Sequence, residues 1–247
     1  MAYKDIKYAV RNSVATITID RPKVHNAFRG QTCEEMVDAF NKAAWNDDIG
    51  VIVLTGAGTK AFSSGGDQGA HDGVYDGRGT IGLPIEELHS IMRDAPKPVI
   101  AKVRGWCIGG GNVLATICDL TIAGESAVFG QAGPRMGSVD PGFGTNLLAR
   151  HVGQKKAKEI WFLCRQYSAQ ESMEMGLVNA VVPDAQLDAE VRRWCDEILQ
   201  MSPTAIALGK RAFNAETESI RGLSNLGNIA VRLYYDSPEG REGERAF

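Results

Sequence analysis

The segment 61–67, Ala-Phe-Ser-Ser-Gly-Gly-Asp, and the run Gly109-Gly110-Gly111 decide the fold. Each glycine-rich turn follows a strand-like stretch, 51–54 in the first case and 99–103 in the second. Open α/β sheets bind their ligands at the carboxyl ends of strands, and glycine leaves the backbone N–H groups there unobstructed. Two such N–H groups that converge form an oxyanion hole, in which each donor stabilises an oxyanion by about 3–4 kcal/mol.

Two purely structural roles for the glycines in these turns stay open at this point. Glycine also serves where a turn needs positive φ, or where a helix packs closely on a strand. Neither turn matches the phosphate-binding patterns G-x-x-x-x-G-K-[ST] and G-x-G-x-x-G, so the sequence gives little support to nucleotide binding.

The chain around these turns alternates strands with helices. Residues 14–20 alternate in polarity and predict a strand, and 49–54 predict a buried strand that ends at Gly56. The pair Thr32 and Glu35 has the pattern of a capping box and predicts the start of a helix. Similar signals extend to a helix over 84–94 with Pro84 in its first position, a strand over 120–123, and glycine-rich loops over 63–82 and 130–144.

The last hundred residues are predicted to be mainly helical. Ser168 and Glu171 form a second capping-box pattern, and Gly176 suits the position just after a helix. Apolar residues from Leu187 to Met201 mark one face of a longer helix, and Ser202 is the expected N-cap of the next. Repeated β/α units followed by helices indicate an α/β architecture.

Composition excludes several classes of function. The chain has 247 residues, 44% of them hydrophobic, with 27 basic against 30 acidic residues, which is typical of a soluble globular protein. A net charge of −3 shows no excess of basic residues that would favour binding to nucleic acid or to an anionic membrane. No signal-peptide pattern is visible, so we expect a cytoplasmic protein that does not enter the membrane. The five cysteines lack metal-ligand spacing, so we expect buried thiols and no metal.

The order and spacing of these motifs resemble the crotonase (enoyl-CoA hydratase/isomerase) superfamily over essentially the whole chain. The likeness is carried by 61–67, by Pro96-Lys97-Pro98-Val99-Ile100-Ala101, by 109–111 and by Cys118-Asp119-Leu120. It implies a ββα spiral core over residues 1–190 and a C-terminal helical oligomerisation (trimerisation) region over 191–247. It also implies an acyl-CoA substrate, no cofactor beyond the CoA moiety, and a homo-oligomer that is a trimer or a dimer of trimers.

The resemblance also assigns residues to the site. The oxyanion hole falls on the backbone N–H groups of Gly66 and Gly110. Hydratases of the family carry two glutamates, and their places are taken here by Val113 and Gly133, neither of which can move a proton. Simple hydration of an enoyl-CoA is therefore not expected.

The segments 130–134, 137–140 and 159–167 resemble one branch of the superfamily, which contains 2-ketocyclohexanecarboxyl-CoA hydrolase and naphthoate synthase. The loop over 75–84 and the residues after the triple glycine are more similar to the hydrolase. We therefore expect hydrolytic opening of a cyclic β-keto acyl-CoA through a stabilised enolate. Three alternatives stay open: ring closure by a naphthoate synthase, hydrolysis of a larger fused-ring thioester, and a non-catalytic or RNA-binding homologue.

Within that branch, Asp140 is the expected base, although the following Pro141-Gly142 also suits an Asx turn. Ser138 would hydrogen-bond the ring ketone or water, unless it is an ordinary loop hydroxyl. Tyr235 would protonate the enolate, in many relatives from a neighbouring subunit, and core packing is its alternative role.

The remaining expected contacts are with substrate and CoA. Tyr75 resembles a substrate-gating tyrosine, and His71 is either a proton shuttle or a solvated loop residue. His89 and His151 are interpreted as structural. Basic residues commonly extend the tail in relatives and help hold CoA. The full set of expected binding residues is Lys23, His25, Ala27, Ser64, Gly65, Asp67, Gln68, His71, Tyr75, Trp106, Ile108 and Gly109.

Overall fold

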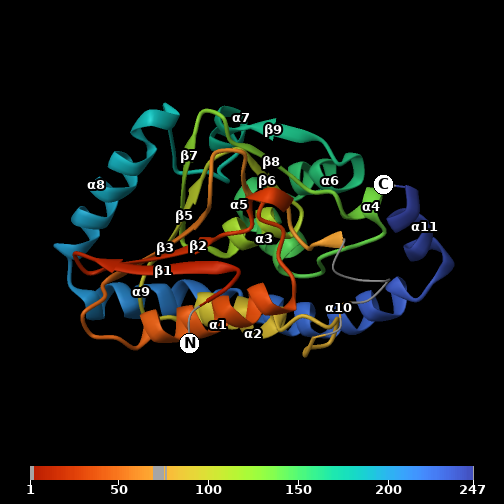
Figure 1. The fold of residues 1–247 in the computed structure, drawn as a ribbon, viewed down its shortest axis with the longest axis horizontal. Helices are drawn as coiled ribbons and strands as arrows, with labels where there is room; N and C mark the ends of the chain where they lie inside the picture. The colour runs from red at the N-terminus through yellow and green to blue at the C-terminus, as the bar shows by residue number, and fades with distance from the viewer. Residues whose placement is uncertain (1–2, 69–74, 76, 247) are drawn as a thin grey trace.

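A computed structural model describes residues 3–68, 75 and 77–246 of the chain (Figure 1). In this part of the chain, six strands form one sheet in the order β1-β2-β3-β5-β7-β10, and four form a second sheet in the order β4-β6-β8-β9. The pairs β1–β2 and β8–β9 are antiparallel, and the other pairs are parallel. The strands are β1 (Ile6–Arg11), β2 (Val14–Ile19), β3 (Val51–Gly56), β4 (Ala61–Ser63), β5 (Val99–Val103), β6 (Trp106–Ile108), β7 (Leu120–Gly124), β8 (Val128–Gly130), β9 (Gln166–Ser168) and β10 (Ala180–Val182).

A ββα unit repeats along the chain and builds both sheets. A long strand (β3, β5 or β7) enters the large sheet, and a three-residue strand (β4, β6 or β8) enters the small sheet before a helix. The three long strands are neighbours in one sheet and the three short strands in the other, so each unit stacks beside the previous one. The expected α/β spiral of the crotonase type is confirmed.

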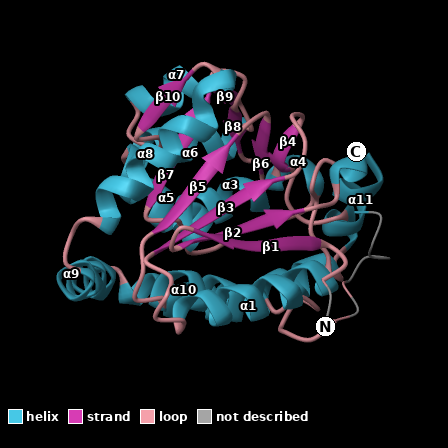
Figure 2. Cartoon of the chain, turned by 60° about the vertical axis from the view of Figure 1, so that its left-hand side comes forward, coloured by secondary structure: helices cyan, strands magenta, loops and turns pink. Residues whose placement is uncertain are grey.

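Helices cover the sheets and form the C-terminal region. Figure 2 shows α1 and α10 lying along one side of the large sheet, with α8 on the far side of it and α11 beside the chain terminus. The helices are α1 (Gly30–Ala44), α2 (Ile85–Asp94), α3 (Gly110–Ile117), α4 (Gly133–Met136), α5 (Leu148–Val152), α6 (Gln154–Leu163), α7 (Ala169–Glu174), α8 (Leu187–Leu199), α9 (Pro203–Glu216), α10 (Glu218–Tyr235) and α11 (Pro238–Ala246). A π-helical turn spans Phe143–Leu147, and 3-10 turns span Pro22–Val24 and Asp184–Gln186.

An ion pair between a buried lysine and a partly exposed aspartate attaches the C-terminal helices to the sheets. Lys210 of α9 donates to Asp119 Oδ2 at 2.7 Å and to the carbonyl oxygens of Met92 and Lys97 at 3.0 Å each. Asp119, at the start of β7, also accepts from the Val99 N–H of the neighbouring strand at 2.7 Å. One lysine therefore connects α9, the end of α2 and two strands.

Two predicted helix starts were wrong in detail. Helix α1 begins at Gly30 after Arg29, so Thr32 is its third residue and not its cap. The Thr32 hydroxyl instead donates to Asp5, and the Glu35 carboxylate accepts from the N–H groups of Lys4 and Asp5. Pro84 is the N-cap of α2, so the first helical residue is Ile85.

The other helix signals were confirmed. The Ser168 side chain accepts from Glu171 N in a capping box, and Gly176 follows α7 with φ of +88°. Ser202 caps α9 by accepting from Ala205 N. The short strands β4, β6 and β8 were missed, because three residues are too few to show an alternating pattern.

Candidate active site

Three glycine-rich segments meet because the short strands before them are neighbours. β4 pairs with β6, and β6 pairs with β8, all in parallel. Parallel strands end at the same edge of a sheet. The turn after β4 carries Gly66, the turn after β6 carries Gly110, and the segment after β8 leads to Asp140. Residues more than seventy positions apart in the sequence therefore meet at one edge.

The turns of Gly66 and Gly110 offer two backbone donors. Within the described part of the chain, neither N–H donates a hydrogen bond. Gly110 begins α3, so its N–H also carries the positive end of the helix dipole. A Cβ on Gly65, which has φ of +95°, would lie 2.8 Å from Gly110 N. The two turns therefore touch, and glycine at position 65 is required for both conformation and space.

The loop over residues 21–28 holds the first turn in place. Phe28 N donates to Gly65 O at 2.8 Å, and Asp67 N donates to Phe28 O at 2.9 Å. Asn26, which is fully buried, donates to Ala61 O at 2.7 Å. These hydrogen bonds fix the backbone on both sides of Gly66.

An ion pair supports the same turn. Arg21 Nη1 lies 2.7 Å from Asp67 Oδ2 and also donates to Ala27 O at 2.5 Å. Asp67 was predicted to contact the substrate, and it does line the cavity described next, but its carboxylate is paired with Arg21. Sequence reasoning missed Arg21 and Asn26 as positioning residues, and the only signal was that both lie in a loop directly before the site.

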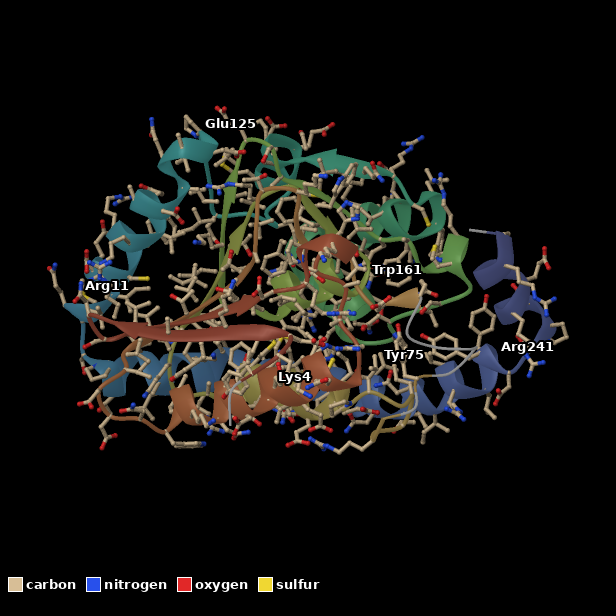
Figure 3. All side chains as sticks on the ribbon, in the orientation of Figure 1. Lys4, Arg11, Tyr75, Glu125, Trp161 and Arg241 are labelled. Atoms are coloured by element: carbon tan, nitrogen blue, oxygen red, sulfur yellow. The ribbon has the colours of Figure 1, made fainter. Side chains whose placement is uncertain are left out.

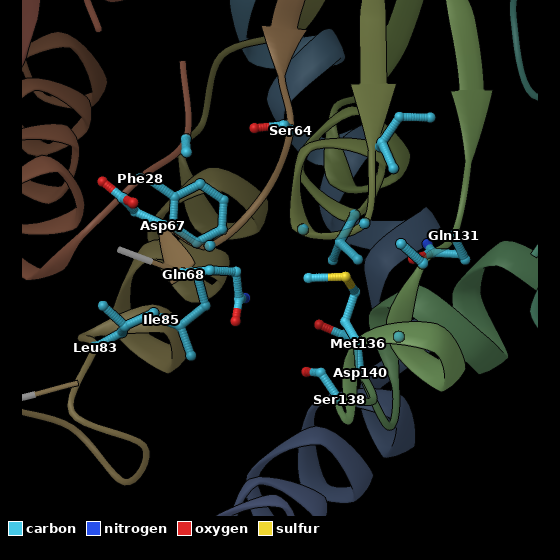
Figure 4. Close-up of a pocket in the computed structure, with 18 of the residues that line it drawn as sticks. Phe28, Ser64, Asp67, Gln68, Leu83, Ile85, Gln131, Met136, Ser138 and Asp140 are labelled. Atoms are coloured by element: carbon cyan, nitrogen blue, oxygen red, sulfur yellow. The ribbon is translucent and has the colours of Figure 1, made fainter. Parts of the chain in front are cut away.

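A cavity of about 580 Å³ opens at this edge of the sheet. Figure 4 shows Phe28, Leu83 and Ile85 on one wall, and Met136, Ser138 and Asp140 on the wall opposite. The predicted residues that line it are Asp140, Tyr235, Ser138, Gly66, Gly110, His25, Ala27, Ser64, Asp67, Gln68, Tyr75, Trp106, Ile108 and Gly109.

Two residues that were predicted to contact the substrate do not line the cavity, and a third is not described. Gly65 supports the neighbouring turn without lining the cavity, and Lys23 lies exposed on the surface beside Val24, which does line it. His71 lies outside the described residues. Sequence reasoning did not identify Asn228 or Gln131 as cavity residues and assigned His89 a structural role, yet all three line the cavity.

Asp140 faces the cavity from the segment after β8. Its Oδ1 accepts from Gly144 N at 2.7 Å, so the carboxylate also caps the π-helical turn. Burial raises the pKa of Asp140 from 3.8 to about 6, an effect that the Gly144 hydrogen bond partly opposes. Near neutral pH this group is ionised, and it is a stronger base than an ordinary aspartate.

Tyr235 and Ser138 form a hydroxyl pair on the same side of the cavity. Tyr235 is the last residue of α10, and its hydroxyl lies 2.9 Å from Ser138 Oγ. Burial raises the pKa of Tyr235, the Ser138 hydrogen bond lowers it, and the Asp140 charge raises it. The phenol is therefore neutral at working pH and able to donate a proton. The tyrosine belongs to the same chain as the cavity that it reaches.

Tyr75 lies against Gly66, the first of the two glycines that offer a backbone donor. Its side chain is buried, and a Cβ on Gly66 would overlap the Tyr75 hydroxyl. Figure 3 shows Tyr75 and Trp161 inside the molecule, whereas Arg11, Glu125 and Arg241 lie at its edge. The hydroxyl therefore lies directly against Gly66, on the side where a side chain at that position would stand.

The two positions that lack a glutamate both line the cavity. Val113 presents an apolar side chain from α3. A Cβ on Gly133 would lie 2.7 Å from the Trp161 ring and would overlap the Ser138 carbonyl oxygen. Position 133 therefore has no room for any side chain in this backbone arrangement, and Asp140 is the acid–base carboxylate that the cavity offers beside the paired Asp67.

Three further features of the described residues concern metal ligands, membrane-spanning helices and cysteines. Across residues 3–68, 75 and 77–246, no group of three His, Cys, Asp or Glu side chains is arranged to hold a metal ion. In the same part of the chain, none of the helices is long and apolar enough to cross a membrane. All five cysteines are buried and free, as predicted, and burial raises the pKa of Cys107 and Cys118.

Comparison with known proteins identifies the family of this chain. The model of the enoyl-CoA hydratase/isomerase family matches residues 9–246. The chain belongs to this family, the crotonase superfamily, whose enzymes act on CoA thioesters.

Solved structures of bacterial proteins are similar over nearly the whole chain. An enoyl-CoA hydratase from Mycobacterium avium subsp. paratuberculosis K-10 is 29% identical, with a TM-score of 0.88 and coverage of 100% of this chain and 96% of that one. An enoyl-CoA hydratase/isomerase from Xanthobacter autotrophicus Py2 is 32% identical, with a TM-score of 0.83 and coverage of 99% and 96%. OdaA from Pseudomonas aeruginosa is 27% identical, with a TM-score of 0.90 and coverage of 99% and 98%.

Proposed function

We propose that this enzyme hydrolyses a carbon–carbon bond in a cyclic β-keto acyl-CoA, with 2-ketocyclohexanecarboxyl-CoA as substrate and pimeloyl-CoA as product. One observation carries the proposal. The cavity combines two unused backbone donors with a single unpaired acid–base carboxylate, Asp140, among its described lining residues, while the hydratase positions Val113 and Gly133 hold none.

The reaction begins with addition of water to the ring ketone. Asp140, a base with a pKa of about 6, takes a proton from water as the oxygen bonds to the ketone carbon. Ser138 hydrogen-bonds the ketone oxygen or the water. The product of this step is a tetrahedral intermediate on the ring.

Collapse of the intermediate breaks the bond between the former ketone carbon and the carbon next to the thioester. The electron pair of that bond becomes a thioester enolate, whose oxygen the Gly66 and Gly110 N–H groups stabilise. Tyr235 protonates the enolate carbon, and the proton held by Asp140 restores the phenol. The former ketone carbon becomes a carboxyl group at the other end of the same acyl chain, so the overall reaction adds one water.

Naphthoate synthase activity is the alternative proposal, because the same constellation could stabilise an enolate that closes a ring. The contact between the Tyr75 hydroxyl and Gly66 supports it, since this tyrosine resembles one that gates substrate in the synthase branch.

The measurement that tests the activity is the mass of the product formed from 2-ketocyclohexanecarboxyl-CoA. A gain of one water that Asp140→Asn abolishes supports the hydrolase. No change in mass contradicts hydrolysis of this substrate. With o-succinylbenzoyl-CoA, loss of water would instead identify the synthase.

We also propose that the chain forms a homo-oligomer through α9 and α10. Leu226, Ile229 and Leu233 of α10 are each more than half exposed and lie on one helical face, and Phe213 of α9 is 81% exposed. Exposed apolar patches of this kind mark interaction surfaces. Light scattering should give the mass of a trimer or a hexamer for the native protein, and a smaller species for Leu233→Glu. A native monomer would contradict the proposal.

A further inference from the structure

His89 places a polar group in the cavity that the proposed reaction does not use. It lies one turn after Ile85 on α2, and both side chains line the cavity. The residue is 2% exposed. Its imidazole makes no hydrogen bond in the described part of the chain, and Nδ1 is buried without a partner. A buried polar atom without a partner costs about 1–3 kcal/mol, so the fold gains no stability from the polarity of this ring.

The protein holds the imidazole in a fixed and uncharged form. Its ring packs edge-on against Phe143, with centroids 5.3 Å apart and planes at 88°. Burial lowers the pKa of His89 to about 3, so the ring is neutral at physiological pH. Because Nδ1 is buried, Nε2 is the ring nitrogen that can hydrogen-bond a ligand. It acts as a donor or as an acceptor, according to the tautomer of the ring.

A second polar side chain reaches the cavity from α10. Asn228 is 6% exposed and lines the cavity, and its side-chain amide makes no hydrogen bond within the described part of the chain. Its helix is held close at this point, because Gly227 packs on Pro141 and Ser224 packs on Gly142. The amide offers both a donor and an acceptor. His89 and Asn228 thus border the same volume from two helices that pack on the turn after Asp140.

The surroundings of this pair define what it can bind. Leu83, Ile85 and Val113 also line the cavity and are apolar. Among the described lining residues there is no Lys or Arg, so a carboxylate would find no cation there, and the charge of Asp140 would repel it. A neutral oxygen on an otherwise apolar ring satisfies both requirements.

We propose that His89 and Asn228 form a specificity subsite for a neutral oxygen substituent, a hydroxyl or a carbonyl, on the ring of the acyl group. The inference rests on the proposed function only in assuming that a ring acyl-CoA enters this cavity. It narrows the substrate class to cyclic β-keto acyl-CoAs whose ring carries a further oxygen substituent.

Binding without turnover tests this proposal. The ligands are cyclohexanecarboxyl-CoA and its 2-, 3- and 4-hydroxy derivatives, which lack the ketone that ring opening needs. Calorimetry should show that at least one hydroxy derivative binds the native protein about tenfold more tightly than the plain ring. That preference should disappear in His89→Leu and Asn228→Leu, and His89→Gln should retain part of it.

Controls separate a lost hydrogen bond from a damaged cavity. Met136→Leu changes another lining side chain without removing such a group, and it should keep the preference. Affinity for the plain ring should stay within a few-fold in every variant that melts like the native protein. The proposal is overturned if no hydroxy derivative is preferred, or if the preference survives in both leucine variants. Failure of ring opening leaves these binding results intact, so the two proposals fail separately.

Discussion

Replacement of Asp140 by asparagine should make the protein more stable and less active at the same time. The carboxylate is buried at the cavity, and this burial raises its pKa from 3.8 to about 6. The asparagine oxygen can still accept the 2.7 Å hydrogen bond from Gly144 N, so the local backbone keeps its partner. The variant removes a buried charge and little else.

The size and pH dependence of the effect follow from the two pKa values. The native state holds the Asp140 proton more tightly than the unfolded chain, so the stability that the neutral form contributes is complete below pH 3.8. It is lost as pH rises through about 6. The full difference corresponds to about 3 kcal/mol, and solvation from the open cavity reduces it to about 1–2 kcal/mol.

Urea unfolding of both proteins between pH 4 and pH 8 measures this effect. We expect Asp140→Asn to match the native protein near pH 4 and to exceed it by about 1–2 kcal/mol at pH 8, while ring opening falls by about 10²–10⁴-fold. Asp94→Asn is the matched control of opposite sign, since the two hydrogen bonds from Arg221, both 2.8 Å, lower the pKa of Asp94. A stability gain that is independent of pH, or a loss at pH 8, would refute the reasoning.

Three further substitutions test separate features. Tyr235→Phe should lower kcat by about 10²–10⁴-fold with little change in KM, as judged by steady-state kinetics, and an unchanged kcat would exclude its phenol as the acid. Gly133→Ala should destabilise by about 1–3 kcal/mol in urea unfolding, because its Cβ would crowd Trp161 and Ser138, and a neutral effect would show that the loop relaxes. Lys210→Met should cost about 1–3 kcal/mol by the same measurement, because it removes three hydrogen bonds and leaves the partly exposed Asp119 carboxylate without its cation, and a neutral effect would contradict the role of the pair.

The sequence predicts the fold where hydrophobic patterns are long and local. The strands β3, β5 and β7 were found because each has five or six residues with a strong apolar pattern. The start of α1 was predicted wrongly because a distant partner changed the use of the side chains. Asp5, far from Thr32 in sequence, accepts the hydrogen bond of the Thr32 hydroxyl, and the oxygen of that hydroxyl accepts from Arg29 N before the helix. No local pattern contains that information.

The site residues also fall into two groups: those that a local sequence pattern predicts, and those that only the packing of distant elements reveals. Gly66, Gly110 and Asp140 lie in glycine-rich turns, which are visible as local signals, and the resemblance supplied their roles. His89 and Asn228 lie within helical patterns, where a lone polar residue is usually part of a satisfied core. Only the packing of α2 and α10 around the turn of Phe143 shows that these two side chains border the cavity.

The choice of reaction depends as much on missing side chains as on those present. The three short strands bring three turns to one edge, and the first two supply only backbone donors. In the proposed reaction the acid–base carboxylate therefore comes from the third segment, since Val113 after the second turn carries none. Here Trp161 and the Ser138 carbonyl occupy the space beside Gly133, so a glutamate cannot be added at that position without moving both. A change from the proposed ring opening to hydration would require a glutamate at position 113 and remodelling of the segment from Gly133 to Asp140.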